Sequence, residues 1–235
     1  FNFFTLESNF HSFPSGHSST IFMVCFILAS TFPKLKYFFY VFASIVALSR
    51  VVVGAHFFTD ILAGALVALV TFKVLNNIIE KNLNQFKFSE LIFSKNSEFY
   101  FFLLFLIMCC LFITVGPSLD LYVAGLFYKG ASQFYLQSFD ILSIFFREIF
   151  LPFILIYILI LPIVGYFIKF DRLYFGYKFS LKEIFFIWVS QIICILIFIN
   201  LILKNLWGRA RPNDVFEFGG QETFFTWYKL SNSCE

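Results

Sequence analysis

The sequence predicts an all-α, polytopic membrane protein with six transmembrane helices and short interfacial helices. Of its 235 residues, 60% are hydrophobic and 13% are charged, whereas a soluble domain carries about 25% charged residues. The mean hydropathy is +0.85. The apolar residues form runs near the roughly 20 residues that a helix needs to cross a bilayer, and they lack the alternation of a β-barrel. We expect one membrane-embedded domain over residues 1–235.

Six apolar segments are expected to be the helices. They lie near residues 18–33, 37–55, 56–76, 98–116, 148–169 and 183–203. Between the fourth and fifth, residues 117–147 contain "LDLYVAGLFYKG" and "FDILSIFFREIF", which are amphipathic and rich in aromatic residues. Such stretches favour short helices in the membrane interface, and ordinary loop packing explains them equally well.

The polar connectors predict the orientation. Residues 33–36, 73–98 and 169–182 would share one side of the membrane and contain 10 Lys and Arg, against 7 on the other side. The positive-inside rule therefore places these connectors in the cytoplasm. Three polar motifs, which border the apolar segments at 13–20, 49–60 and 204–212, then all face outward.

The motif "SRVVVGAHFFTD" at 49–60 pairs a histidine with a carboxylate. Gly54 permits a break, and a new helix starting near Ala55 would place His56 and Asp60 at i,i+4 on one face, within hydrogen-bond reach of each other. A carboxylate behind an imidazole fixes its tautomer and stabilises its charged form. His56 would then act as a base or a nucleophile. The alternative is a buried pair that only holds helices together.

The motif "FPSGHSST" at 13–20 predicts the start of a helix. Pro14 suits a first helical turn. Ser15 and Gly16 would then offer a hydroxyl and backbone N–H groups to an anion, and His17 would lie beside that anion as a proton donor. An ordinary helix cap explains the same residues.

The motif "KNLWGRARP" at 204–212 gathers cations after an apolar run. Lys204 and Arg211 lie two helical turns apart and would point the same way, with the helix ending near Arg211 because Pro212 follows. Snorkelling interfacial cations are the alternative. Taken together, the three motifs supply cations, N–H groups and histidines to one tetrahedral oxyanion, which favours phosphoryl transfer.

Other classes of protein are disfavoured. A net charge of +3, spread over several loops, argues against nucleic acid. The five cysteines show no CxxC spacing, so neither a zinc site nor a disulfide framework is supported. We expect no metal, no cofactor and no obligate protein partner beyond the lipid bilayer.

The three motifs resemble the signature of the type 2 phosphatidic acid phosphatases (PAP2). K-x6-R-P (204–212), P-S-G-H (14–17) and S-R-x5-H-x3-D (49–60) match it at every signature position. The resemblance implies a PAP2-like helical core and a metal-independent phosphatase. It implies that His56 attacks phosphorus to form a phosphohistidine, that Asp60 orients His56, and that His17 protonates the leaving oxygen. The implied phosphate-binding residues are Lys204, Arg211, Arg50, Ser15, Gly16 and Ser49.

The chain departs from the family in motif order, because the Lys/Arg motif comes last here and first in the family. We therefore expect a circularly permuted chain whose native ends lie within 76–98. The alternative is a natural chain that lost the family's order.

The expected substrate is a lipid phosphate at the outer face of a bacterial inner membrane, facing the periplasm. Residues 117–130, 208–220 and 224–234 resemble bacterial lipid A phosphatases, and the intact P-S-G-H favours the 1-phosphate type. Undecaprenyl pyrophosphate and phosphatidylglycerol phosphate are alternatives. Arg209 and Lys229 are read equally well as headgroup contacts or as surface charge.

Two alternatives come from other classes. One is a vanadate haloperoxidase, against which the six apolar spans argue. The other is a lipid transporter or scaffold with a fossil site, against which the intact His17, His56 and Asp60 argue.

Overall fold

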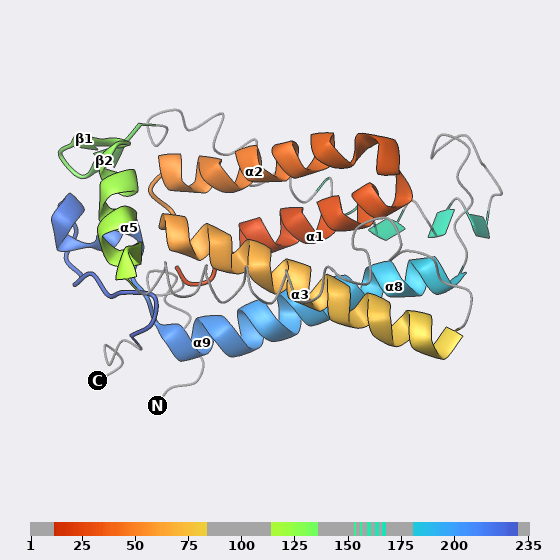
Figure 1. Ribbon diagram of the computed structural model, residues 1–235. Coiled ribbons are helices and arrows are strands. Elements are labelled where there is room, and N and C mark those ends of the chain that lie inside the picture. The colour runs from red at the N-terminus through yellow and green to blue at the C-terminus, as the bar shows by residue number, and fades with distance from the viewer. Residues whose placement is uncertain are drawn as a thin grey trace.

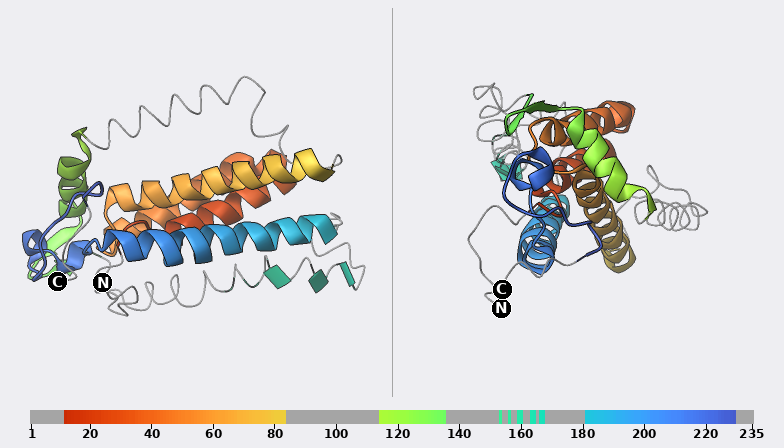
Figure 2. Two further views of the ribbon diagram at one scale, coloured as in Figure 1. Left: turned by 90° about the horizontal axis from the view of Figure 1, so that it is seen from below. Right: turned by 90° about the vertical axis from the view of Figure 1, so that its left-hand side faces the viewer.

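Four long helical segments run side by side in a bundle (Figures 1 and 2). The computed structural model describes residues 12–83, 114–135 and 181–229, with eight isolated helical residues between 153 and 167. The segments are α1 (Gly16–Thr31), α2 (Lys36–Val52), α3 (Phe58–Leu83) and a continuous rod. That rod consists of α8 (Leu181–Gln191), the π-helix η5 (Ile192–Leu203) and α9 (Lys204–Trp207).

Three helical stretches in the described part of the chain are long and apolar enough to cross a membrane. They are Pro33–Val52, Phe58–Ile78 and Glu183–Leu203, with mean hydropathies of 1.6, 1.9 and 2.6, and α1 is apolar but shorter. The first includes the one-turn helix η2 (Pro33–Leu35). Helices are thus confirmed at four of the six predicted segments. Of the other two predicted segments, 98–116 is described only at its last three residues and 148–169 only at eight isolated positions, so six spans remain a prediction.

Helix α1 lies at the centre of the bundle, in contact with α2, α3 and η5. A small residue of α3 lets it approach the start of α1 closely: a Cβ added to Gly64 would lie 2.5 Å from the Ser15 carbonyl oxygen. Ser18 Oγ donates to the Ile61 carbonyl at 2.6 Å. Small residues and interhelical hydrogen bonds hold helices together in a bilayer, where apolar burial alone gives little. The first turns of α1 and α3 are therefore fixed against each other.

Aromatic packing fills the middle of the bundle. Phe72 of α3 contacts Phe26 of α1 and Phe186 of α8, with ring centroids 6.0 and 5.6 Å apart. Edge and tilted arrangements of this kind add about 0.5–1.5 kcal/mol per pair beyond the buried area. Many outward apolar side chains are exposed, among them Tyr37, Ile45 and Phe185, as lipid-facing positions require.

A small cap covers one end of the bundle (Figures 1 and 2). It contains α5 (Gly116–Gly125), the antiparallel strands β1 (Tyr128–Gly130) and β2 (Gln133–Phe134), and the 3₁₀ helices η6 (Pro212–Asp214) and η7 (Phe216–Phe218). Phe57, Phe134, Val215 and Phe218 form its apolar core. The hairpin corrects the all-α prediction. The predicted interfacial helix at 119–130 is helical only to Gly125.

Two further predictions concern segments that the structure covers little or not at all. The second interfacial helix, expected at 139–150, lies outside the described residues. The native ends expected within 76–98 fall partly in α3, which continues to Leu83, and partly beyond the described part of the chain. The circular permutation stays a prediction.

Candidate active site

The three motifs meet at the capped end of the bundle. The start of α1, the end of α2, the start of α3 and the end of α9 all lie there (Figure 1). Each motif is therefore carried by a helix terminus, and the helices fix its position. This convergence is the arrangement that the sequence predicted.

His56 lies in the turn between α2 and α3, which corrects the prediction that a helix starts near Ala55. Helix α2 ends at Val52 and α3 begins at Phe58. Gly54 has φ +72°, and a Cβ there would lie 2.1 Å from Asn213 Oδ1, so only glycine fits this turn. The N–H groups of Ala55 and His56 both donate to the Arg50 carbonyl, at 3.0 and 3.3 Å. The turn holds His56 firmly without helical geometry.

The hydrogen bond of His56 assigns its tautomer. Nδ1 lies 2.8 Å from the Ser12 carbonyl oxygen. A carbonyl only accepts hydrogen bonds, so Nδ1 carries the proton and Nε2 keeps its lone pair. Burial lowers the pKa of His56 below its ordinary 6.5, an effect that Asp60 opposes and that the charges of Arg50 and Arg211 reinforce. A neutral imidazole with an unprotonated Nε2 is the form that attacks an electrophile.

Asp60 supports His56 through Ser12. The predicted direct hydrogen bond is absent, because Nδ1 and Asp60 Oδ2 are 3.8 Å apart. Instead, Ser12 Oγ donates to Asp60 Oδ2 at 2.5 Å, while the Ser12 carbonyl accepts from His56. Asp60 Oδ2 also accepts from the Phe57 N–H at 2.8 Å, the bond by which an acidic residue caps a helix start. Ser12 is thus a linking residue that the sequence did not reveal.

His17 faces His56 from the first turn of α1. The two ring centroids are 6.5 Å apart and the rings are tilted by 55°. The sequence placed these residues in separate motifs, 39 positions apart, and the fold brings them together. A reacting group that lies between the two rings could therefore contact one histidine on each side.

The predicted cations gather around the same point. A Cβ built on Gly16 would lie 3.4 Å from Lys204 Nζ. Burial and the neighbouring charge of Arg211 lower the pKa of Lys204, while Arg50 and Arg211 act on His56. The prediction that one helix carries Lys204 and Arg211 is wrong: α9 ends at Trp207, and Gly208 turns the chain with φ +57°. Arg211 reaches the site from an extended segment.

The two serines of the predicted phosphate-binding set are engaged elsewhere. Ser15 caps α1: its fully buried hydroxyl accepts from the Ser18 N–H at 3.3 Å, and its own N–H donates to the Asp60 carbonyl. Pro14 precedes that cap and is not in the first turn. Ser49 Oγ donates to the Val46 carbonyl at 2.7 Å. Gly16 opens α1, where first-turn N–H groups lack intrahelical acceptors.

Arg209 is neither a headgroup contact nor surface charge, the two interpretations that the sequence left open. Its side chain is 1% exposed. Nη1 donates to Asp60 Oδ1 at 2.5 Å and Nη2 to Asp120 Oδ2 at 2.8 Å. Asp120, on α5, is wholly buried as well. Burial raises the pKa of Asp120, and the Arg209 charge opposes that shift. Lys229, by contrast, is exposed.

The sequence held a weak signal for this cluster. Asp120 is an acid within an apolar stretch, "GPSLDLYVAG", and such a residue needs a partner when buried. What it did not show is which cation pairs with it. Arg209 is 89 positions away, beyond any local spacing rule.

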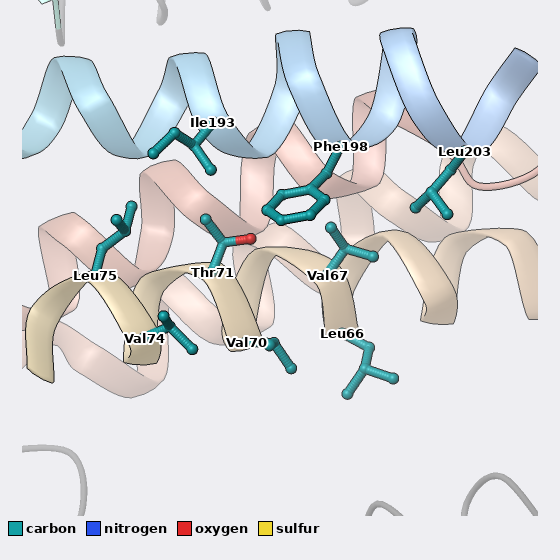
Figure 3. Close-up of a pocket in the computed structure, with 9 residues that line it drawn as sticks. All are labelled: Leu66, Val67, Val70, Thr71, Val74, Leu75, Ile193, Phe198 and Leu203. Atoms are coloured by element: carbon teal, nitrogen blue, oxygen red, sulfur yellow. The ribbon is translucent and has the colours of Figure 1, made fainter. Parts of the chain in front are cut away.

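An apolar cavity of about 520 Å³ lies between α3 and η5. Figure 3 labels its nine lining residues, which are all apolar except Thr71. Leu203, at one end, immediately precedes Lys204. Val70 and Val74, on the α3 side, are 40% and 49% exposed, so the cavity is open along that side. Its shape and lining suit a hydrocarbon chain.

Comparisons with known proteins agree with the motifs. Residues 1–84 match the family model of the PAP2 superfamily. The chain is 31% identical over 129 residues to a lipid A 4'-phosphatase of Francisella tularensis subsp. novicida, covering 53% of this chain and 55% of that protein. It is 41% and 39% identical over 61 residues to lipid A 1-phosphatases of Rhizobium johnstonii and Rhizobium etli, covering 26% of this chain and about a quarter of each relative.

The chain thus spans about half the length of the first relative and less of the other two. No solved structure matches. The family model covers the P-S-G-H motif and the motif that holds His56, and the K-x6-R-P motif meets them in space at Gly16. Residues 1–84 thus match the PAP2 superfamily, and the relatives that the chain resembles are lipid A phosphatases.

Proposed function

We propose that residues 1–235 act as a single membrane-embedded lipid phosphatase domain that works through a phosphohistidine at His56. One observation carries this proposal: a buried carbonyl fixes the proton on Nδ1 of His56 and leaves Nε2 unprotonated, with the charges of Arg50 and Arg211 acting on the ring. A histidine that served only to join helices would not require that cationic surrounding.

The proposed reaction has two steps. In the first, the Nε2 lone pair attacks phosphorus, the ester P–O bond breaks, and His17 gives its proton to the leaving oxygen. The imidazole then carries the phosphoryl group and a positive charge, which the carboxylate of Asp60 stabilises from 3.8 Å. In the second, His17 takes a proton from water, the oxygen attacks phosphorus, and the N–P bond breaks to release phosphate and neutral His56.

The phosphate-binding role falls to Lys204, Arg50, Arg211 and the N–H groups at the start of α1. Preorganised cations and amide donors stabilise the charge that spreads over the equatorial oxygens in phosphoryl transfer. Repulsion between Lys204 and Arg211 is relieved when a dianion binds between them. The hydroxyls of Ser15 and Ser49 have other partners, so we leave them out of this set.

A lipid substrate follows from the surroundings of the site. The apolar cavity begins at Leu203, one residue before Lys204, so a lipid whose phosphate meets the cations could extend a chain into it. Apolar helices surround the site, and the named relatives act on lipid A. The positive-inside rule supports a site that faces the periplasm of a bacterial inner membrane.

Lipid A is the substrate that we propose. The intact P-S-G-H favours the 1-phosphate, whereas the relative matched over the longest stretch is a 4'-phosphatase. Undecaprenyl pyrophosphate and phosphatidylglycerol phosphate are the alternative substrates. Lipid A carrying only one of its two phosphates separates the two positions.

The test is phosphate release from detergent-solubilised lipid A in EDTA, with His56→Ala alongside. We expect release by the wild type and none by the variant. Release that survives His56→Ala would overturn the mechanism, and release that requires an added metal would overturn metal independence. If lipid A and both alternative lipids yield no phosphate, the chain is a transporter or scaffold with a fossil site.

A further inference from the structure

We propose that Arg209 is a positioning residue for catalysis, because it clamps Asp60 against Asp120 and thereby fixes the orientation and tautomer of His56. This inference rests on the proposed function of His56. It makes α5 and Arg209 part of the catalytic apparatus, although α5 lies outside the family signature and Arg209 occupies one of its unspecified positions.

The guanidinium of Arg209 is bound on three sides by protein acceptors. Nη1 donates to Asp60 Oδ1 and to Thr59 Oγ1 at 2.9 Å, Nη2 donates to Asp120 Oδ2, and Nε donates to the Phe225 carbonyl at 2.8 Å. Four of the five N–H groups of an arginine are thereby used. With 1% of the residue exposed, Arg209 does not contact a substrate phosphate.

Asp120 anchors the clamp to the first turn of α3. Its Oδ1 accepts from the Thr59 N–H at 2.8 Å, and its Oδ2 accepts from Thr59 Oγ1 at 2.6 Å. The next residue along the chain is Asp60. Arg209 therefore joins two carboxylates. One is Asp60 itself, and the other is Asp120 of α5, which is bound to the neighbouring Thr59 in the first turn of α3. This arrangement leaves Asp60 little freedom to rotate.

The clamp reaches His56 through Ser12. Asp60 Oδ1 is held by Arg209, which leaves Oδ2 directed at Ser12 Oγ. The Ser12 N–H donates to the Arg209 carbonyl at 3.0 Å, and the Ser12 carbonyl accepts from His56 Nδ1. Arg209 thus positions both the side chain and the backbone of the residue that assigns the His56 tautomer.

Lysine cannot reproduce this clamp. The Arg209 guanidinium carbon lies 4.4 Å from the centroid of the Phe57 ring and 5.3 Å from that of Phe224. A planar group can stack between rings while it donates in its own plane to several acceptors, whereas an ammonium is a point charge on a flexible stem. Arg209→Lys therefore keeps the charge and removes the geometry.

The kinetic test compares Arg209→Lys, Asp60→Ala and the double variant with wild type. We expect kcat of Arg209→Lys to fall roughly 10²-fold, as small misplacements of reacting groups can do, with KM and inhibition by orthophosphate unchanged. The double variant should be no slower than Asp60→Ala alone, because both changes act through the same carboxylate. Losses that multiply, or a wild-type kcat in Arg209→Lys, would overturn the inference.

A second measurement does not depend on activity. The chain has three histidines, so ¹⁵N-histidine labelling in detergent gives few signals, and His56→Gln identifies that of His56. We expect a proton on Nδ1 in the wild type and a mixture of tautomers in Arg209→Lys. An unchanged tautomer would overturn the inference even if the wild type proves inactive, which would refute the proposed function alone.

Asp120→Asn tests the same clamp with a smaller change of shape. The substitution keeps Arg209 and the approximate volume of Asp120, but it replaces the charged acceptor of the Nη2 hydrogen bond with a neutral amide and so weakens that bond. We expect kcat to fall about tenfold, the lower end for partners behind a reacting group, with KM unchanged. A rise in KM with unchanged kcat would contradict a positioning role, and this variant decides the matter if Arg209→Lys does not fold.

Discussion

Arg209 and Arg211 lie two positions apart on one loop and occupy opposite environments. Arg209 is enclosed by two carboxylates and two aromatic rings. Arg211 is partly exposed, and its charge acts on Lys204 and His56. Arg209 neutralises two buried acids of the fold. Arg211 adds positive charge to a surface that could bind a phosphate.

The difference teaches how one residue type can serve structure and binding side by side. A buried cation between acids stabilises a fold only while every partner is present. A cation beside other cations, such as Arg211 near Lys204, repels them, and a bound anion relieves that repulsion. The two arginines should therefore give opposite signatures when each is neutralised, and that contrast can be tested.

The largest effect is expected on stability, from Arg209→Met. Removing the cation leaves Asp60 and Asp120 buried and uncompensated, which typically costs about 3–5 kcal/mol. Thermal unfolding in detergent should show a clearly lower Tm. A Tm equal to that of wild type would mean that the two acids find another partner, and it would contradict the structural role of Arg209.

Arg211→Met is expected to spare the fold and impair binding. Loss of one donor to the transition state typically costs about 10²–10³-fold in rate. We expect kcat/KM to fall by that much and inhibition by orthophosphate to weaken, while the Tm changes little, because Arg211 both repels Lys204 and attracts Asp214. Lys229→Met, which removes an exposed cation, is the matched control on a water-soluble phosphate ester. An equal loss in the control would contradict a specific role for Arg211.

The pH profile sharpens the same contrast. His56 must be neutral to attack, and burial lowers its pKa below 6.5, so the rate should be constant just above that value and fall as pH drops through the lowered pKa. Deprotonation of His17 should produce a second, basic limb and a bell-shaped profile. A profile without limbs from acid to alkaline pH would contradict the two-histidine assignment, if chemistry limits the rate.

The arginine variants should move the acid limb differently. The positive charge of Arg211 lowers the pKa of His56, so Arg211→Met should raise that pKa and shift the acid limb to higher pH. Arg209→Lys keeps its charge, and its acid limb should stay near that of wild type. A shift of the Arg211→Met limb to lower pH would contradict the placement of Arg211 beside His56.

The smallest effect is expected from filling the apolar cavity. Val67→Trp should exclude part of a lipid chain, and each methylene excluded costs about 0.8 kcal/mol, so the loss of two raises KM for a lipid substrate roughly tenfold. A short water-soluble ester should be hydrolysed as before. Val41→Trp, on the exposed face of α2 and outside the cavity lining, is the control. Equal KM for lipid in both variants would exclude this cavity as a chain site.

The sequence predicted the convergence of the site better than its local geometry. His56, His17, Lys204, Arg50 and Arg211 meet as expected, because hydropathy and charge placed all three motifs at one membrane face. Helix ends were less predictable. Pro212 predicted that the last helix ends near Arg211, whereas α9 ends at Trp207, where Gly208 turns the chain. A left-handed glycine after a helix is a stronger stop than a proline further on.

Individual side-chain contacts between distant segments could not be predicted. Ser12 replaces Asp60 as the hydrogen-bond partner of His56 because the turn at Gly54 holds His56 outside the helix. Arg209 meets Asp120 because α5 folds over the start of α3. Neither contact follows a helical spacing, so the buried acid and the extra arginine could be noticed in the sequence but not paired.

The most direct test of the central claim is to trap the covalent intermediate. The wild-type enzyme would be mixed with lipid A, quenched rapidly in alkali to preserve an N–P bond, and digested for mass spectrometry. We predict a phosphoryl group on His56, absent from His56→Gln and formed more slowly in Arg209→Lys. A phosphoryl group on another residue, or full turnover by His56→Gln, would contradict His56 as the nucleophile.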